Sequence, residues 1–393
     1  MRRTMIKSSH VLASLANRAS EAGCVAVDTE FVWERTYYPT LGIVQIALSE
    51  DEAFIVDMLE VEDFTALGEI LSDERIVKIL HDAPQDLTIL RRTTGAYPRN
   101  VFDTRLAAGF AGLSSTVSLS GLLKEILGLK LTKTETRSDW LKRPLTRRQL
   151  SYALDDVRYL PVARRELLFR TENLGHVAWL EEEMTRYDAP DMYEENIMKE
   201  QFLRVKGVNK LSFQGKSVLR ELASWREGMA REKNYPRSWI ISDQMLIKLA
   251  QQEPLTIAEL ESIEGLTKEA INLYGTSVVD AIRKAHSSCD MDKAEHPEPV
   301  SGNKECFNAR VDLALAYMKG KSLSAGIDPA LVATRAEVTA LVRESETALP
   351  ENHRLLRGWR REFLGEELLE LADGRMAVQM DAETGLPVRA QDY

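Results

Sequence analysis

Four acidic residues and one tyrosine lie in three short motifs of this 393-residue chain. VAVDTEF contains Asp28 and Glu30, HDAPQDL contains Asp86, and YALDDVRYL contains Tyr152 and Asp156. Hard divalent cations take oxygen ligands, and bridging carboxylates hold two such ions about 4 Å apart. If the four carboxylates converge, the motifs predict a two-metal pocket that hydrolyses a phosphodiester.

Local structure decides whether these side chains converge. CVAVDTE has the pattern of a strand, on which residues two apart face the same way, so Asp28 and Glu30 project side by side. YALDDVRYL has the pattern of a helix, on which residues four apart share a face, as Tyr152 and Asp156 do. Asp155 also lies near Tyr152 on such a helix and competes with Asp156, so the residues alone leave this choice open.

The proposed chemistry gives each residue a role. Asp28, Glu30 and Asp156 are expected to ligate the metal that binds the attacking water. Asp28 would bridge to the second ion, which Asp86 supports directly or through water. Tyr152 orients this water or helps to deprotonate it, and the ordinary tyrosine pKa of about 10 favours orientation.

Each motif also has a purely structural interpretation. An Asp-x-Glu pair at a strand end is most often a solvated turn, and Asp86 would suit the first turn of a helix that begins near Pro84. Asp103 in VFDTRLA fits either a helix N-cap or an acid outside the ring of metal ligands. The functional interpretation therefore depends on all the motifs occurring in one chain.

Motifs for other chemistries are incomplete. Lys210 stands where the first glycine of a phosphate-binding loop should precede GKS at 215–217, and the six histidines form no HExxH. The three cysteines include no CxxC pair, which fits a reducing compartment. No apolar run reaches the roughly 20 residues that a bilayer span needs. We therefore expect a cytoplasmic protein that binds neither zinc nor a membrane.

The elements that must position the motifs follow from hydrophobic periodicity. Three β-rich runs between 24 and 57 predict an antiparallel meander, after which helices alternate with strands. Thr146 and Gln149 fit a capping box that begins the helix carrying Tyr152, and Pro161 should kink this helix or open a new one. This order predicts a mixed sheet covered by helices. The other helices are expected near 63–72, 84–92, 104–110 and 119–127, with strands near 77–80 and 100–103.

Charge is distributed unevenly along the chain. The net charge is −10, yet residues 204–237 hold nine bases against three acids. Lys142 and Arg143 belong to a second basic concentration just before the helix that carries Tyr152. Solvated helix faces explain any one such cluster, but basic segments beside a metal pocket favour contact with a phosphate backbone.

The motifs and their surroundings resemble the ribonuclease D family of DEDD-type 3′–5′ exonucleases, which use a tyrosine in the third motif. The resemblance is carried by VAVDTEF, YYPTLGIVQIAL, HDAPQDL, VFDTRLAAGF and SDWLKRPLTRRQLSYALDDVRYL. KGVNKLSFQGKSVLRELASWREGMAREKNYPRSWIISDQ is similar to the helical nucleic-acid-binding (HRDC) module of the same family and of RecQ helicases. A more divergent second copy follows in LALAYMKGKSLSAGIDPALVATRAEV and HRLLRGWRREFLG.

The resemblance implies an α/β nuclease domain with a ribonuclease H-like mixed sheet and flanking helices, followed by two small all-α modules. We expect the nuclease domain over 1–180, the first module over 197–286, a linker over 287–304 and the second module over 305–375, with a loose tail after 372. This chain length exceeds the roughly 250–300 residues at which single cores split into domains.

The resemblance also implies an activity and a site. The activity is removal of 3′-terminal mononucleotides from structured RNA, chiefly tRNA precursors, by a monomer that uses two Mg²⁺ or Mn²⁺ ions and no protein partner. A 3′–5′ DNA exonuclease and a non-catalytic RNA-binding scaffold are the alternatives. The pattern selects Asp156 over Asp155. The residues expected at the site are Tyr152 for catalysis, Asp28, Glu30, Asp86 and Asp156 for metal, and Thr29, Phe31, Lys142 and Arg143 for substrate contact.

Overall fold

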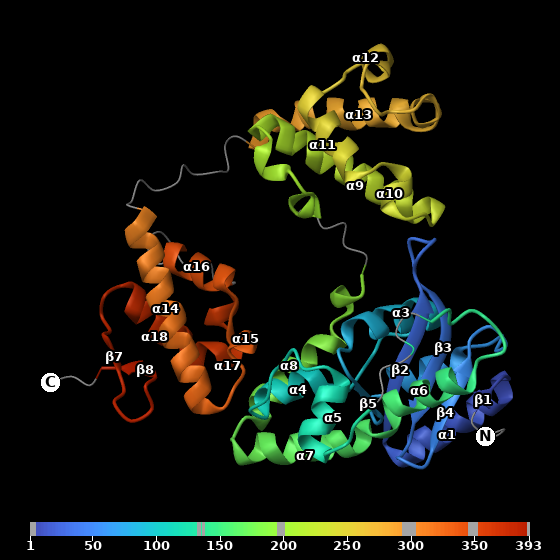
Figure 1. Cartoon of the computed structure of the whole chain (residues 1–393), viewed down its shortest axis with the longest axis vertical. Coiled ribbons are helices and arrows are strands. Elements are labelled where there is room, and N and C mark those ends of the chain that lie inside the picture. Colours follow the sequence, from blue (N-terminus) through green and yellow to red (C-terminus); the bar gives the residue numbers. More distant parts are fainter. Residues whose placement is uncertain are drawn as a thin grey trace. The chain divides into compact units, whose positions relative to one another are not determined.

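The computed structural model describes residues 5–131, 135, 138–194, 201–292, 304–344 and 353–390. The chain forms two compact units (Figure 1). Unit 1 comprises residues 1–31, 41–193 and 301–393, and unit 2 comprises residues 32–40 and 194–300. Within the described residues, no helix combines the length and the apolar character that crossing a bilayer requires.

A six-stranded mixed sheet forms the centre of unit 1, in the order β1-β4-β3-β2-β5-β6. Strands β3 and β4 pair antiparallel, as the meander predicts, whereas β2, β5 and β6 run parallel to one another. Residues 41–47 of β3 are all buried, which requires cover on both faces of the sheet. The strands are β1 Met5–Ile6, β2 Cys24–Val32, β3 Thr40–Ala47, β4 Ala53–Asp57, β5 Val77–Leu80 and β6 Val101–Asp103.

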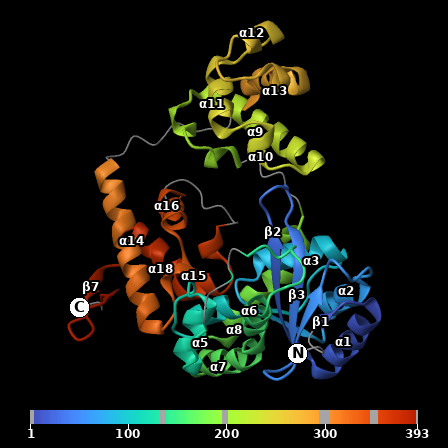
Figure 2. The same cartoon turned by 45° about the vertical axis from the view of Figure 1, so that its right-hand side comes forward.

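Among the described residues, helices α1 to α8 flank this sheet. Figure 2 shows α1 and α2 side by side, and α6 and α7 contact β4 and β5. The Asp103 and Ser118 side chains cap α4 and α5, so these helices begin where the sequence predicts. The helices are α1 Ser9–Ala22, α2 Thr65–Ser72, α3 Pro84–Thr94, α4 Thr104–Phe110, α5 Leu119–Leu127, α6 Arg147–Arg158, α7 Leu160–Asn173 and α8 Val177–Met184, followed by the short 3₁₀ turns η1 Thr185–Asp188 and η2 Pro190–Met192.

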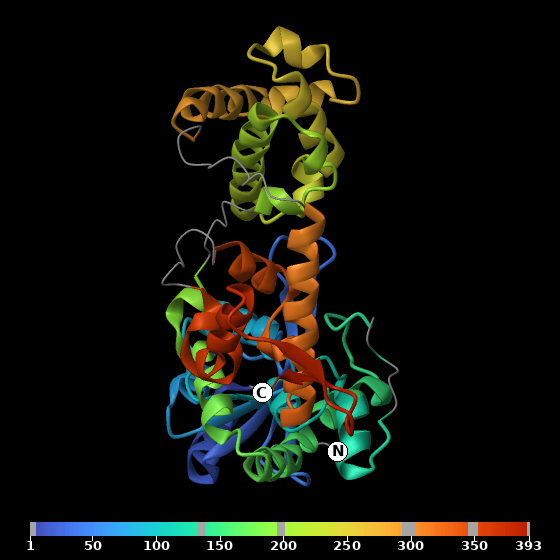
Figure 3. The same ribbon diagram turned by 90° about the vertical axis from the view of Figure 1, so that its left-hand side faces the viewer.

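The last part of unit 1 is a helical bundle with a β-hairpin. The expectation of a loose tail after 372 is wrong, because β7 Val378–Met380 and β8 Pro387–Arg389 pair antiparallel and β8 lies against α14 (Figure 3). A Cβ at Gly320 of α14 would meet the Pro387 carbonyl, so glycine permits this close approach. The helices are α14 Lys304–Ala325, α15 Pro329–Val332, α16 Arg335–Glu344, α17 Gly358–Arg360 and α18 Glu366–Ala372, with η5 Arg354–Leu356 before α17 and the single π-turn η6 Arg361–Gly365 after it.

This C-terminal bundle packs against the sheet-containing part of unit 1 through buried contacts. Trp359 is 1% exposed and lies against the rings of Phe110 and Trp179, with centroids 5.3 and 5.4 Å away. The Trp359 indole donates to Glu183 at 3.0 Å, and Arg360 forms a buried ion pair with the same carboxylate. The bundle and the sheet-containing part therefore share a buried set of aromatic and ionic contacts.

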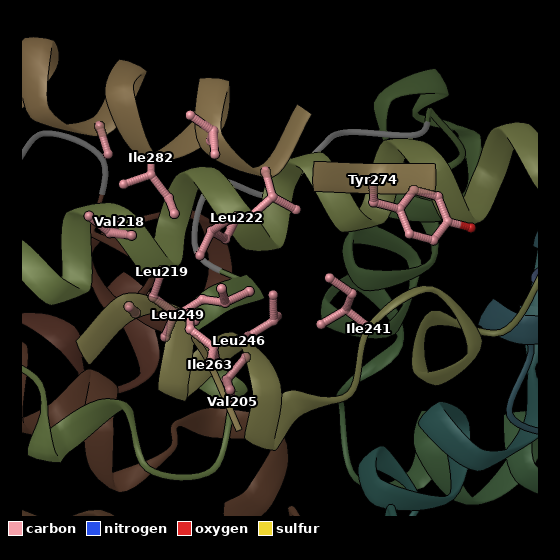
Figure 4. Packing of buried hydrophobic residues seen from close by; sticks show 14 of the residues in the cluster. Val205, Val218, Leu219, Leu222, Ile241, Leu246, Leu249, Ile263, Tyr274 and Ile282 are labelled. Carbon is pink, nitrogen blue, oxygen red and sulfur yellow. The ribbon is translucent and has the colours of Figure 1, made fainter. Parts of the chain in front are cut away.

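Unit 2 is a helical module with its own core. α9, α11 and α13 bury a cluster that includes Leu219, Leu222, Leu246 and Ile282 (Figure 4). α13 continues to Asp292, into the segment expected to be a linker, and residues 293–303 lie outside the described chain. The elements are η3 Gln201–Arg204, η4 Val208–Lys210, α9 Phe213–Lys233, α10 Arg237–Ile240, α11 Asp243–Gln252, α12 Ile257–Glu261 and α13 Lys268–Asp292.

Candidate metal centre

Three of the predicted carboxylates meet in unit 1. Asp28 and Glu30 come from β2, and Asp156 comes from α6. Each offers one oxygen, and these oxygens lie within 4.8 Å of one another. Two elements far apart in sequence therefore supply a compact set of hard oxygen ligands.

A capping box at the start of α6 determines where this helix begins and therefore which of its side chains face the carboxylate cluster. The Thr146 backbone N–H donates to the Gln149 side chain at 2.9 Å, and the Gln149 N–H donates to the Thr146 hydroxyl at 3.2 Å. This is the predicted capping box. Asp155, the competing acid, is paired with Arg158 at 3.4 Å, whereas Asp156 joins Asp28 and Glu30.

Asp86, the fourth predicted carboxylate, lies in the first turn of α3. Pro84 begins this helix, and the Thr29 hydroxyl donates a short hydrogen bond to the Asp86 carboxylate. Thr29 therefore links β2 to α3, and the substrate contact expected of Thr29 stays a prediction. The negative charge of Asp86 acts on both Asp28 and Glu30, which places it beside the cluster.

Crowding of acids dominates the electrostatics of the site. Burial, followed by the charges of Asp156 and Asp86, raises the pKa of Glu30 to about 9. Burial also raises the pKa of Asp86, to about 7, and that of Asp28 rises for the same reason together with the charges of Asp86, Asp156 and Glu30. The raised pKa values of Asp28, Glu30 and Asp86 show that burial and mutual repulsion oppose the ionisation of these three acids.

Divalent metal ions fit this donor set. The donors are carboxylate oxygens, which suit Mg²⁺ and Mn²⁺, and the excess negative charge requires positive charge for neutralisation. Asp28, Glu30 and Asp156 have the spacing to hold one ion between them.

Tyr152 lies one turn before Asp156 on α6 and contacts the same cluster. Burial, and then the charges of Asp156 and Glu30, raise its pKa far above the ordinary tyrosine value. Its ring lies 6.1 Å from that of Trp140, which is buried. The phenol is thus a protonated hydrogen-bond donor in this site.

The three other residues expected to contact substrate have different surroundings. Arg143 donates from Nε and Nη2 to Asp57 at 2.8 and 2.6 Å, and its remaining N–H groups donate to the carbonyls of Trp140, Lys142 and Gly42. All its donors are engaged within the fold, so Arg143 is a structural residue. Lys142 is exposed, and Phe31 is partly buried near the end of β2.

Two residues support the site: Gln45, to which the sequence alone assigned no role, and Asp103, which caps α4 as one of its two interpretations expected. Gln45 of β3 is fully buried, and its Nε2 donates to Asp28 at 3.2 Å. Its signal is a single amide within the apolar run LGIVQIAL. Asp103 accepts N–H bonds from Asp82 and Ala83 as well as capping α4, so it shapes the turn before α3.

Comparison with known proteins identifies the family of this chain. Residues 3–168 match the family described as 3′–5′ exonuclease, and residues 215–282 match the HRDC domain. Ribonuclease D of Desulfotalea psychrophila is 42% identical over 92% of this chain and 96% of that protein. Ribonuclease D of Escherichia coli is 30% identical over 93% of this chain and 97% of that protein.

Solved structures extend the agreement to the fold. The crystal structure of Escherichia coli RNase D, described as an exoribonuclease involved in structured RNA processing, covers 95% of this chain and 99% of its own, with a TM-score of 0.80 at 29% identity. A Bifidobacterium adolescentis protein shares the fold, with a TM-score of 0.68 at 20% identity over 94% and 97% of the two chains. These matches confirm a mixed-sheet nuclease followed by helical modules, and the chain belongs to the ribonuclease D family.

Proposed function

We propose that this 3′–5′ exoribonuclease removes mononucleotides one at a time from the 3′ ends of structured RNA, chiefly tRNA precursors, with two divalent metal ions. The observation that carries the proposal is the convergence of Asp28, Glu30 and Asp156 within 4.8 Å. Asp28, Glu30 and Asp156 would hold one ion, and Asp28 with Asp86 the other. Bound ions supply positive charge for the phosphate and leaving oxygen and make a water nucleophilic near neutral pH.

The protein's own groups position the reactants. Tyr152 keeps its proton because its pKa is raised, so its hydroxyl donates a hydrogen bond and orients the attacking water. Thr29 holds the Asp86 carboxylate, and Gln45 holds that of Asp28. These contacts fix the carboxylates before substrate arrives, which lowers the reorganisation needed during the reaction.

We also propose the domain boundaries, the role of the helical modules, the oligomeric state and the location of the protein. The proposed domain boundaries are 1–180, 197–286 and 305–375, although α8 continues to Met184, α13 to Asp292 and β8 to Arg389. The two helical modules contribute RNA affinity rather than chemistry. We propose that the protein works as a monomer, and its scattered cysteines fit the reducing environment of the cytoplasm.

The test is incubation of the pure protein with a 3′-extended tRNA precursor, with and without a chelator, and sizing of the products over time. We expect single-nucleotide shortening that the chelator stops. Asp28→Ala and Asp156→Ala should reduce shortening to the chelated level. Asp155→Ala is the matched control, because Asp155 pairs with Arg158 outside the cluster, and it should keep the wild-type rate.

Two results would contradict the proposal. Full activity of Asp156→Ala would remove the metal centre from the reaction. Equal hydrolysis of a matched DNA strand would favour the DNA exonuclease instead, because only contacts that sense the 2′-hydroxyl distinguish RNA from DNA.

A further inference from the structure

Unit 2 contains a pocket of about 620 Å³ that the metal centre does not explain. This volume lies within the range typical of small-ligand sites. Trp33 and Tyr37 line it from the segment 32–40, and Arg204 and Arg237 line it from the helical module. All these residues belong to unit 2.

A hydrogen-bond network fixes one wall of this pocket. The Tyr37 hydroxyl donates to Glu227 and accepts from Arg231 Nε at 3.0 Å and Arg237 Nη2 at 3.3 Å. The Tyr37 backbone N–H donates to the Asn234 carbonyl at 3.2 Å. The wall is therefore formed before any ligand binds, which reduces the entropy lost on binding.

Arginines outnumber acids around the pocket. Glu227 is 4% exposed and receives hydrogen bonds from Arg237 and an ion pair from Arg231. Asp243 is paired with Arg226 at 2.7 Å. Arg204, whose side chain is exposed, adds a further positive charge. The balance favours a ligand that carries a phosphate group.

An exposed aromatic ring completes the pocket. Trp33 is 51% exposed although its indole N–H donates to the Tyr37 carbonyl at 2.9 Å, so its orientation is set while ring surface faces solvent. Trp239, next to the lining residue Ser238, is also more than half exposed. Aromatic rings beside arginines are the combination that unpaired nucleic-acid strands use, with bases stacked on rings and phosphates near guanidinium groups.

We propose that this pocket binds one nucleotide of an unpaired RNA strand, with the base on Trp33 and its phosphate near Arg204 and Arg237. The inference rests on the proposed exoribonuclease function and adds a strand-binding site outside the metal centre. It assigns unit 2 a specific contact with the unpaired tail, in addition to general attraction for RNA. Stacking is sequence-tolerant, as an enzyme that removes every nucleotide in turn requires.

The test measures binding without hydrolysis, using the full-length protein in chelator. Fluorescence anisotropy reports the affinity for a hairpin RNA with an unpaired 3′ tail of about ten adenosines, and for the same hairpin without the tail, at several salt concentrations. Trp33→Ala should weaken binding of the tailed RNA about tenfold with little change in salt dependence. Arg204→Ala should weaken it as well and reduce the salt slope by about 0.7.

Matched variants control for surface and folding effects. Leu273→Ala and Lys268→Ala remove exposed apolar and cationic side chains of unit 2 that do not line the pocket, and both should bind as the wild type does. Trp33→Phe keeps a stacking ring and should retain most of the affinity. Unfolding midpoints of all variants should agree within a few degrees.

The outcomes separate the two proposals. The pocket assignment would be overturned if Trp33→Ala and Arg204→Ala bound the tailed RNA as tightly as the control variants do. Equal weakening on the tailless hairpin would also overturn it, because the pocket is assigned to an unpaired strand. Hydrolysis of the tailed RNA in Mg²⁺ is measured in parallel, and its absence would refute the exoribonuclease proposal while leaving the binding result intact.

Discussion

The Nε2 atom of Gln45 lies 3.2 Å from Oδ2 of Asp28, so a buried amide on β3 orients a carboxylate on β2. Groups that form hydrogen bonds to metal-ligating side chains affect metal affinity because they fix the orientation of the ligand. Gln45→Leu should weaken divalent-metal binding and lower activity by roughly 10–100-fold. Isothermal titration with Mn²⁺ measures the first effect directly.

The control for Gln45→Leu is Ile46→Val, a change at the next buried position of the same strand. It trims the core but touches no carboxylate, so its metal affinity should equal that of the wild type. A Gln45→Leu protein with unchanged Mn²⁺ affinity would show that the hydrogen bond to Asp28 has no role in metal binding.

Tyr152→Phe should lower kcat by about 100-fold and leave metal affinity unchanged, because the variant removes an orienting hydroxyl but no carboxylate ligand. Single-turnover hydrolysis of a short RNA, combined with metal titration, separates these effects. Tyr159→Phe is the matched control, since Tyr159 lies at the end of α6 outside the carboxylate cluster. A kcat reduced by less than threefold would remove the hydroxyl from the reaction.

Asp103→Ala should destabilise the protein by roughly 2–4 kcal/mol, because it leaves several buried donors without an acceptor. These donors include the N–H groups of Asp82 and Ala83 and the Tyr187 hydroxyl, which lies 2.7 Å from Asp103. Asp103→Asn keeps one acceptor oxygen and should cost less. Urea unfolding monitored by tryptophan fluorescence measures both.

The comparison for Asp103 is Asp63, an exposed acid that accepts from the Thr65 N–H at the start of α2. Asp63→Ala should cost less than about 1 kcal/mol, because water replaces the lost acceptor. If Asp103→Ala and Asp63→Ala lowered the free energy of unfolding equally, burial of the Asp103 hydrogen bonds would contribute nothing to stability.

The ion pair of Glu183 with Arg360 should make stability depend on pH. Burial alone would raise the Glu183 pKa, but hydrogen bonds from Arg360 and Trp359 outweigh it and lower the pKa. The stabilisation is therefore complete above the ordinary glutamate pKa of 4.5 and is lost as pH falls through the lower folded-state pKa. Burial lowers the Arg360 pKa too, yet a guanidinium stays protonated throughout this range.

Glu183→Gln should cost about 3 kcal/mol at neutral pH, since it leaves Arg360 buried without a counter-charge. It should also flatten the acid limb of stability measured by urea unfolding from pH 7 to pH 3. Glu166→Gln, which breaks the half-exposed pair with Arg170, should cost under about 1 kcal/mol. An unchanged acid limb in Glu183→Gln would contradict the role given to this pair.

The sequence predicted the elements around the site closely because their signals are local. The capping box at Thr146 and the N-cap at Asp103 each begin a helix at the expected residue, and Pro161 lies in the first turn of a new helix after α6 ends. Strand and helix periodicity also placed Asp28 beside Glu30, and Tyr152 one turn from Asp156. The family pattern, and not the periodicity, selected Asp156 over Asp155.

Contacts between distant segments could not be predicted in the same way. Nothing near Arg143 in sequence indicates that Asp57, at the end of β4, engages its guanidinium, so the sequence alone favours a substrate contact for this charged residue before α6. The hairpin after residue 372 was not predicted because each of its strands is only three residues long, and its contact with α14 depends on Gly320, far away in the chain.

The burial of Trp359 among Phe110, Trp179 and Phe363 limits how this enzyme can be dissected by shortening. A protein truncated near residue 300 would expose to water the apolar side chains that Trp359 covers. Such a truncated protein would aggregate or be degraded during expression, even with every catalytic carboxylate intact. Loss of activity on C-terminal truncation therefore says little about RNA contacts, and single side-chain replacements are the cleaner instrument.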